Sequence, residues 1–297
     1  MKQRLAASLH LCDFHRFDVR YTTRCRFANI FHNLMYLLRS FSFFEASLEE
    51  TCQICGEEGT SMPTVEVNDI QMYYEIHGEG RPLVLIGGLG LDLSELQSIS
   101  SWLAQRYQVI VFDNRGAGRT DKPDIPYSIE MMAEDTAELL KALTIERASL
   151  LGISMGGRIA LDLALRYPER VEKLVLVSTS ARVMNTRRRW RARLLGLVSS
   201  LPLFQSKHPQ PRYAFLRQLQ ASGSYNCIKR LHELRIPTII LHGKADRTAP
   251  YALAEEMHAG IQGSRLLPFK GGHLFFLFGE RQQFLDTTAE FMENESE

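Results

Sequence analysis

The chain has 297 residues, of which 45% are hydrophobic and 23% charged, with a formal net charge of +1. This composition allows a large buried core and excludes the highly charged, weakly hydrophobic class of disordered proteins. The small net charge gives no electrostatic reason to expect a nucleic-acid or membrane partner. No apolar run reaches about 18 residues, so we expect no membrane-spanning helix.

Residues 1–61 differ from the rest of the chain, because neither strand nor helix periodicity is regular in them. They hold four of the five cysteines. Cys52 and Cys55 form a C-x-x-C, but no second ligand pair follows at zinc-site spacing, so we expect no metal there. Polar residues interrupt the aromatic stretch at 27–44, which disfavours a membrane-bound helix. We predict a poorly ordered extension that folding and chemistry do not require.

The cysteines are too few and too scattered for a disulfide framework, and only Cys227 falls after the extension. This usage is typical of a reducing compartment. We therefore expect a cytoplasmic protein.

From residue 62 onward, apolar strand-like runs alternate with amphipathic helix-like runs. A hairpin comes first, because 65–67 and 70–74 flank the turn pair Asn68-Asp69. Further strands are expected at 83–86, 108–112, 148–151, 173–177, 238–241 and 265–269, and helices at 94–105, 129–143, 155–167, 251–259 and 281–292. Short, continuously apolar strands between helices predict a doubly wound α/β fold with a parallel sheet covered on both faces. Ligands of such sheets bind at the carboxyl ends of the strands.

The alternation lapses after residue 180 and resumes at 235. The intervening segment contains an arginine-rich run at 187–193 and several prolines, and it ends in a helix-like run. We interpret residues 181–234 as a short helical cap inserted between two parts of the core, 62–180 and 235–297. One solvated face of the cap explains the arginines better than a nucleic-acid site does, and we expect no nucleic-acid partner.

The most informative motif is a G-x-S-x-G formed by Gly152, Ser154 and Gly156, between an expected strand and an expected helix. Such a motif is typical of a nucleophile elbow. The serine occupies a strained turn, and the glycines leave room for the neighbouring strand and helix. The amide groups at the start of the helix then point toward the serine oxygen. The motif predicts Ser154 as a nucleophile, but its frequent chance occurrence makes partner residues necessary.

A serine hydroxyl needs a base to accept its proton and an acid to orient that base. No Asp or Glu occurs from residue 181 to 232, whereas Asp246 lies in a loop after the expected strand 238–241. His273 follows the last expected strand, while His258 falls inside a helical pattern. We therefore predict Ser154, Asp246 and His273 as a catalytic triad. A turn-capping role for Asp246 and a buried loop position for His273 are the alternatives.

Two other histidines, His242 and His77, lie among turn residues, and we expect structural roles for both. An oxyanion hole needs two donors aimed at the tetrahedral intermediate. Met155 N–H, next to the nucleophile, is one candidate. The glycine-rich loop at 87–90 is expected to supply the other, which we assign to Leu89 N–H. No Lys-Ser/Thr follows this loop, which disfavours a phosphate-binding loop.

Together these motifs resemble the α/β-hydrolase superfamily over residues 62–292. Residues 112–123 are similar to the D-x-R-G-x-G-x-S-D-x-P stretch of that superfamily, and 167–171 and 237–246 are family-like as well. The resemblance implies an eight-stranded, mostly parallel sheet that begins with an antiparallel hairpin, and a helical cap. It is closest to the branch of carboxylesterases, enol-lactonases and cofactor-free haloperoxidase-like proteins. The chain departs from many members by having Gly87-Gly88 in place of His-Gly, and by its short cap.

We predict hydrolysis of a small carboxylic ester or lactone through an acyl-enzyme on Ser154, without a metal or an organic cofactor. A serine rather than an aspartate at the elbow disfavours haloalkane dehalogenase and epoxide hydrolase chemistry. Two alternatives stay open. The same triad supports C–C bond hydrolysis and cofactor-free perhydrolase or haloperoxidase chemistry, and a hydrolase fold can also serve as a binding protein without turnover. No sequence feature indicates an oligomeric state.

Overall fold

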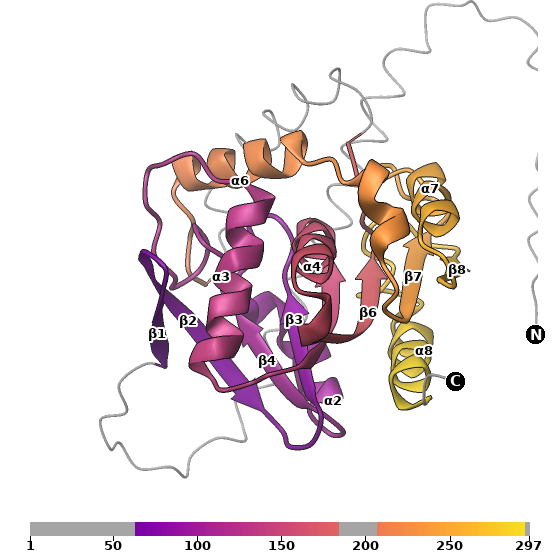
Figure 1. Cartoon of the computed structure of the whole chain (residues 1–297), viewed down its shortest axis with the longest axis horizontal. Coiled ribbons are helices and arrows are strands. Elements are labelled where there is room, and N and C mark those ends of the chain that lie inside the picture. The colour runs from indigo at the N-terminus through magenta and orange to yellow at the C-terminus, as the bar shows by residue number, and fades with distance from the viewer. Residues whose placement is uncertain (1–62, 184–206, 295–297) are drawn as a thin grey trace, which may run out of the picture. The chain divides into compact units, whose positions relative to one another are not determined.

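The computed structural model describes residues 63–183 and 207–294 (Figure 1). The predicted poorly ordered extension at 1–61, with its C-x-x-C, and the arginine-rich run at 187–193 lie outside these described residues. Within the described residues, no helix combines the length and apolarity that crossing a membrane requires.

An eight-stranded sheet forms the centre of the fold, with the strand order β1-β2-β4-β3-β5-β6-β7-β8. The strands are β1 (Thr64–Val67), β2 (Ile70–His77), β3 (Pro82–Ile86), β4 (Gln108–Phe112), β5 (Ala148–Ile153), β6 (Val171–Val177), β7 (Thr238–Gly243) and β8 (Arg265–Phe269). β1 pairs antiparallel with β2, β2 pairs antiparallel with β4, and the remaining pairs are parallel. The predicted mostly parallel α/β fold and its opening hairpin are therefore confirmed.

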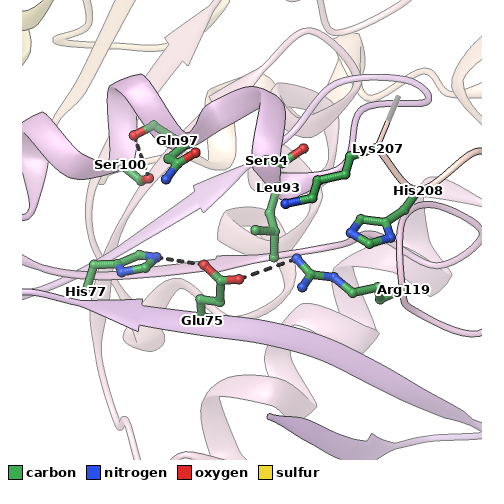
Figure 2. Close-up of a pocket in the computed structure, with 9 residues that line it drawn as sticks. All are labelled: Glu75, His77, Leu93, Ser94, Gln97, Ser100, Arg119, Lys207 and His208. Atoms are coloured by element: carbon green, nitrogen blue, oxygen red, sulfur yellow. Dashed lines mark hydrogen bonds and ion pairs between the residues drawn. The ribbon is translucent and has the colours of Figure 1, made fainter. Parts of the chain in front are cut away.

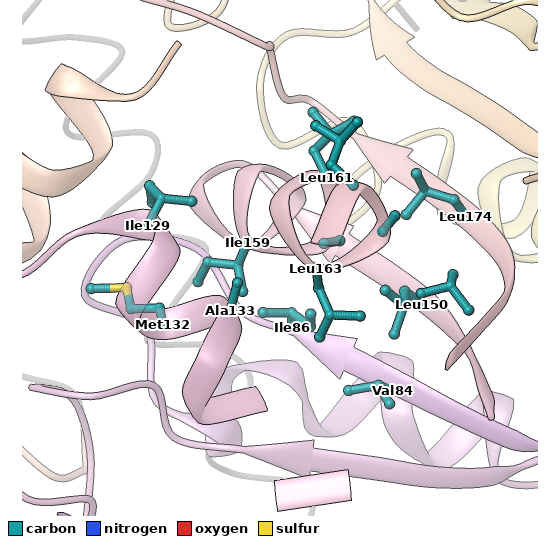
Figure 3. Close-up of a cluster of buried hydrophobic side chains, with 14 of the residues drawn as sticks. Val84, Ile86, Ile129, Met132, Ala133, Leu150, Ile159, Leu161, Leu163 and Leu174 are labelled. Carbon is teal, nitrogen blue, oxygen red and sulfur yellow. The ribbon is translucent and has the colours of Figure 1, made fainter. Parts of the chain in front are cut away.

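Helices cover both faces of the sheet. They are α2 (Gln97–Leu103), α3 (Ile129–Ala142), α4 (Met155–Arg166), α7 (Ala252–Gly260) and α8 (Arg281–Glu293). Helices α2 and α8 share one buried apolar cluster with the sheet, and α3, α4 and α7 share the other. Side chains of β3 alternate between the two, with Leu83 and Leu85 in the first cluster. Val84 and Ile86 lie in the second cluster (Figure 3). Because both faces are buried, the strand is apolar at every one of these positions.

Local capping explains where two helices begin. Ser128 accepts a hydrogen bond from Met131 N–H and starts α3 at the expected residue. The helix expected at 94–105 is instead divided. Asp92 and Glu95 form a capping box around a 3₁₀ turn, η2 (Leu93–Leu96), and α2 follows it. Leu91 and the capping residue Asp92 connect the glycine-rich loop at 87–90 to this turn.

Within the segment 181–234, which was predicted as a cap, the structure describes helix α6 (Arg212–Ser224) and a 3₁₀ helix, η6 (Ile228–Glu233). Helix α6 begins directly after Pro211. Proline suits this position because a backbone N–H at the start of a helix has no intrahelical acceptor, so its absence costs no hydrogen bond. Tyr213 on this helix donates a hydrogen bond to the carbonyl of Lys122, and Arg217 forms an ion pair with Asp124. The helix is thereby attached to the loops that follow β4.

Candidate active site

Ser154 lies between the end of β5 and the first residue of α4, with φ 55° and ψ −112°. A non-glycine residue in this region is strained by about 1–3 kcal/mol and persists only where its surroundings fix it. Here the end of β6 and the residues after it provide that support. Ser154 N–H donates to the Val177 carbonyl at 2.9 Å, and the Thr179 hydroxyl donates to the Ser154 carbonyl at 2.6 Å.

The two glycines of the motif have a steric cause. A Cβ at Gly152 would lie 2.5 Å from the carbonyl oxygen of Gly156, and a Cβ at Gly156 would lie 2.1 Å from that of Ile86. Both obstacles are backbone atoms that cannot rotate away. The expectation that these glycines leave room for the adjoining strand and helix is confirmed.

The structure brings together the three side chains predicted as a triad. His273 Nε2 is 3.0 Å from Ser154 Oγ, and His273 Nδ1 is 2.7 Å from Asp246 Oδ2. Each residue follows the carboxyl end of a different strand, namely β5, β7 and β8, and these ends meet at one edge of the sheet. Because a carboxylate only accepts hydrogen bonds, it favours the proton on Nδ1 and leaves Nε2 free to accept the serine proton.

Asp246 is buried and uses its two oxygens differently. Oδ1 accepts the backbone N–H groups of Thr248 at 2.7 Å and Ala249 at 2.9 Å, whereas Oδ2 faces His273. Burial alone would raise the pKa of this carboxyl, but the hydrogen bonds from His242 and His273 hold the pKa well below its usual range. The turn-capping role and the position beside His273 therefore coexist in one side chain.

Three further histidines lie outside the hydrogen-bonded chain from Ser154 through His273 to Asp246. His242 is fully buried, and its Nε2 lies 2.7 Å from the Ala249 carbonyl and 3.3 Å from Asp246 Oδ2. Because a carbonyl only accepts, Nε2 carries the proton, and His242 supports the Asp246 loop. His77 lies on β2 and pairs with Glu75 at 3.0 Å. His258 Nδ1 is 2.9 Å from Ser264 Oγ.

Two residues after β6 support the site and were not predicted from the sequence. Thr179 holds the backbone of Ser154, and the buried Ser178 donates a hydrogen bond from its hydroxyl to the His273 carbonyl at 2.8 Å. The available signal was a pair of hydroxyl residues directly after an apolar strand, at the edge where ligands bind in such sheets. This signal identifies a location, but it does not reveal which distant backbone groups the hydroxyls reach.

The loop expected to supply the second oxyanion donor lies beside Ser154. A Cβ on Gly88 would lie 3.5 Å from Ser154 Cβ, and Asn114 Nδ2 donates to the carbonyl of Gly87 at 3.1 Å. Within the described residues, neither Leu89 N–H nor Met155 N–H donates a hydrogen bond to another protein group. Both amides therefore remain candidate donors, and their oxyanion role stays a prediction.

The family-like loop after β4 is held by buried charges. Asp113 accepts the backbone N–H of Leu93 and of Arg119, both at 2.7 Å. Arg115 forms an ion pair with Asp135 at 2.7 Å, and both side chains are almost fully buried. These carboxylates bind backbone groups and an arginine rather than His273, so they maintain the loop conformation.

A cavity of about 140 Å³ is lined by residues of β2 and α2 and of neighbouring loops (Figure 2). Its lining includes Glu75 and Arg119, which are joined at 3.4 Å, together with Lys207 and His208 from the segment predicted as a cap. Ser154, Asp246 and His273 do not line it, so we do not assign this cavity to the reaction. Among residues 63–183 and 207–294, no three His, Cys, Asp or Glu side chains converge as a metal site would require.

Comparison with known proteins supports the same architecture. Residues 81–228 match the family model described as the α/β hydrolase fold. A relative from Azorhizobium caulinodans that carries the name "putative carbamate hydrolase RutD" is 31% identical over 244 residues, covering 72% of this chain and 92% of that protein.

Two solved structures are similar over most of the described fold. The enol-lactonase from Burkholderia xenovorans LB400 has a TM-score of 0.69 at 26% identity, covering 78% of this chain and 100% of that chain. The esterase EaEST from Exiguobacterium antarcticum has a TM-score of 0.67 at 26% identity, covering 78% of this chain and 99% of that chain. The chain is therefore a member of the α/β-hydrolase fold family and a hydrolase.

Proposed function

We propose that the protein hydrolyses a small carboxylic ester or lactone through an acyl-enzyme on Ser154. One observation carries this proposal, the continuous hydrogen-bonded chain from Ser154 Oγ through His273 to Asp246, with distances of 3.0 and 2.7 Å. This arrangement matches the requirements of a serine nucleophile, a general base and an orienting acid.

In the first step, Ser154 Oγ attacks the substrate carbonyl carbon while His273 Nε2 accepts the hydroxyl proton. The Asp246 carboxylate stabilises the imidazolium that forms. The backbone N–H groups of Met155 and Leu89 stabilise the negative charge on the carbonyl oxygen. When the tetrahedral intermediate collapses, His273 gives its proton to the leaving alcohol, and the acyl group stays on Ser154.

In the second step, a water molecule replaces the alcohol. His273 removes a proton from this water as it attacks the acyl carbon, and the same two amides again face the oxyanion. Collapse of the second intermediate returns the proton to Ser154 and releases the acid. A lactone follows the same path, except that its alcohol and acid remain one molecule.

The names of the similar structures support the substrate class, because one is an enol-lactonase and the other an esterase. The relative named for carbamate hydrolysis supports a second candidate, since attack on a carbamate carbonyl uses the same groups. The carbonyl carbon of a carboxylic ester is more electrophilic than that of a carbamate, because the carbamate nitrogen donates electron density into the carbamate carbonyl. We therefore expect the ester to be the faster substrate.

Labelling with a fluorophosphonate, combined with a substrate panel, tests the proposal. We expect the phosphonate on Ser154 in peptide mass spectra, and faster turnover of p-nitrophenyl acetate and a small lactone than of a phenyl carbamate. The Ser154→Ala variant is the labelling control. A labelled serine with faster carbamate turnover would favour the second candidate, and a labelled serine without any turnover would favour a binding protein. A phosphonate attached only elsewhere would contradict the proposal.

A further inference from the structure

Gln218 is a fully buried glutamine on the cap helix α6. Polar residues of a cap usually face solvent, and burial of a primary amide is costly unless its groups are hydrogen-bonded. Its burial therefore indicates a specific set of partners in the structure beneath α6.

Both ends of the Gln218 amide are hydrogen-bonded to backbone groups of the core. Its Oε1 accepts the N–H of Gly90 at 3.0 Å, and its Nε2 donates to the carbonyl of Arg115 at 2.7 Å. The opposite orientation of the amide would place oxygen against a carbonyl and NH₂ against an N–H. The two partners therefore determine how the side chain is oriented.

Gly90 is the last residue of the loop at 87–90, which contains the proposed donor Leu89 N–H. This loop has glycine at three of its four positions, and Gly90 itself has φ +74°. Glycine restricts the backbone least, and within the described residues the turn around Leu89 is closed only by a long hydrogen bond of 3.4 Å from Leu91 N–H to the Gly88 carbonyl. Contacts from outside the loop therefore help to fix the direction of the Leu89 N–H. Asn114 fixes one end through the carbonyl of Gly87, and Gln218 fixes the other through Gly90 N–H.

The aromatic ring of Phe215 adds a packing contact between α6 and the same loop. A Cβ on Gly90 would lie 3.1 Å from this ring, so the helix is seated closely against the glycine. Helix α6 is thus joined to the loop by a hydrogen bond and an apolar contact, both at Gly90. Displacement of α6 would remove both from the residue next to Leu89.

We propose that Gln218 is a positioning residue for the oxyanion hole, through which helix α6 of the cap fixes the Leu89 N–H beside Ser154. This inference rests on the proposed function. Gln218 does not touch the substrate, and it acts by holding Gly90 and Arg115 together. Donor geometry matters most for the charge that develops in the transition state, so its loss lowers kcat far more than it changes KM.

The test compares Gln218→Met with Tyr213→Phe. Methionine keeps the volume and loses both hydrogen bonds, whereas phenylalanine removes another cap-to-core hydrogen bond of the same helix, from Tyr213 to the Lys122 carbonyl at 2.7 Å. We expect kcat for p-nitrophenyl acetate to fall by about tenfold to a hundredfold in Gln218→Met, with little change in KM. The Tyr213→Phe variant should keep the wild-type kcat.

Two further measurements separate positioning from a loss of folded protein. Active-site titration with the fluorophosphonate expresses kcat per reactive serine. Inhibition by a boronic acid, which forms a tetrahedral adduct on the serine, should weaken in Gln218→Met by about the same factor as kcat falls. Gln218→Asn retains a side-chain amide, but the side chain is one methylene too short to reach both Gly90 and Arg115. This variant should therefore show the same loss of kcat and of boronic acid affinity as Gln218→Met.

A wild-type kcat per titrated site in both Gln218 variants would overturn the inference. A lower kcat with unchanged boronic acid affinity would also overturn it, because the defect would then lie outside the oxyanion hole. Failure of the proposed function looks different, since the wild-type protein would then show no turnover that depends on Ser154.

Discussion

Replacing Ser154 by alanine is expected to lower kcat for p-nitrophenyl acetate by at least about 10⁴-fold. Alanine has no oxygen to form the acyl-enzyme, so only the surrounding donors and bound water remain for catalysis. The side chain is small, and the backbone contacts to Val177 and Thr179 do not depend on its hydroxyl. We therefore expect KM and the midpoint of thermal unfolding to change little. Initial rates on purified variant and wild type measure this loss.

Ser100→Ala provides a matched control for this substitution. Ser100 is a buried serine on α2 whose hydroxyl donates to the carbonyl of Gln97, away from the three predicted residues. This variant should retain nearly all of the wild-type kcat. A Ser154→Ala enzyme that keeps more than about a hundredth of the wild-type kcat would rule out Ser154 as the nucleophile.

Asp246→Asn is expected to lower kcat by roughly 10³- to 10⁴-fold while the loop conformation persists. The backbone N–H groups of Thr248 and Ala249 require an oxygen, so the asparagine oxygen takes the Oδ1 position. Its NH₂ then points at His273 Nδ1, which must accept that hydrogen bond. The ring proton moves to Nε2, where it prevents acceptance of the Ser154 proton.

The pH dependence of this effect follows from the pKa of Asp246. Because the folded pKa lies below the ordinary value, the carboxylate is charged throughout the neutral range, and protonation reaches it only in strong acid. The difference in kcat between wild type and Asp246→Asn should therefore be present across neutral pH. In Asp246→Asn, the steady-state rate and the rate of phosphonate labelling of Ser154 should both fall relative to wild type. A variant within about tenfold of wild type at neutral pH would show that Asp246 does not orient the base.

The strands were predictable because their signal is local and physically simple. Burial on both faces demands an uninterrupted apolar run, and the observed β4 has the boundaries expected from the sequence, 108–112. The edge strand β8 also has its expected boundaries, 265–269, although only Phe269 in it is fully buried. The helix at 94–105 was predicted less well, because apolar spacing does not distinguish a 3₁₀ turn from an α-helix. Asp92 and Glu95 decided that boundary through their capping contacts.

The convergence of Ser154, Asp246 and His273 was predictable from topology. Parallel strands place their carboxyl ends along one edge, so residues far apart in the chain meet there once strand order is known. The supporting contacts of Ser178 and Gln218 were not predictable in this way. Each joins a side chain to a distant backbone group, and neither residue type nor spacing reveals that partner.

The two amide contacts on the 87–90 loop illustrate the same limit. Asn114 lies in the family-like stretch at 112–123, but it occupies the variable position of D-x-R, so the motif does not indicate its contact with Gly87. Gln218 lies in the segment predicted as a cap, where the regular alternation of elements is absent from the sequence. Only the packing of α6 against Gly90 reveals its contact.

Detection of the acyl group during the first turnover tests the central claim most directly. The full chain is mixed with p-nitrophenyl acetate, quenched rapidly in acid, digested and analysed by peptide mass spectrometry. If Ser154 is the nucleophile, a burst of nitrophenolate above the steady-state rate must be matched, equivalent for equivalent, by acetyl on the peptide that contains Ser154. A burst of one equivalent with that serine unmodified at every quench time, or with the acetyl group on another residue, would contradict the account.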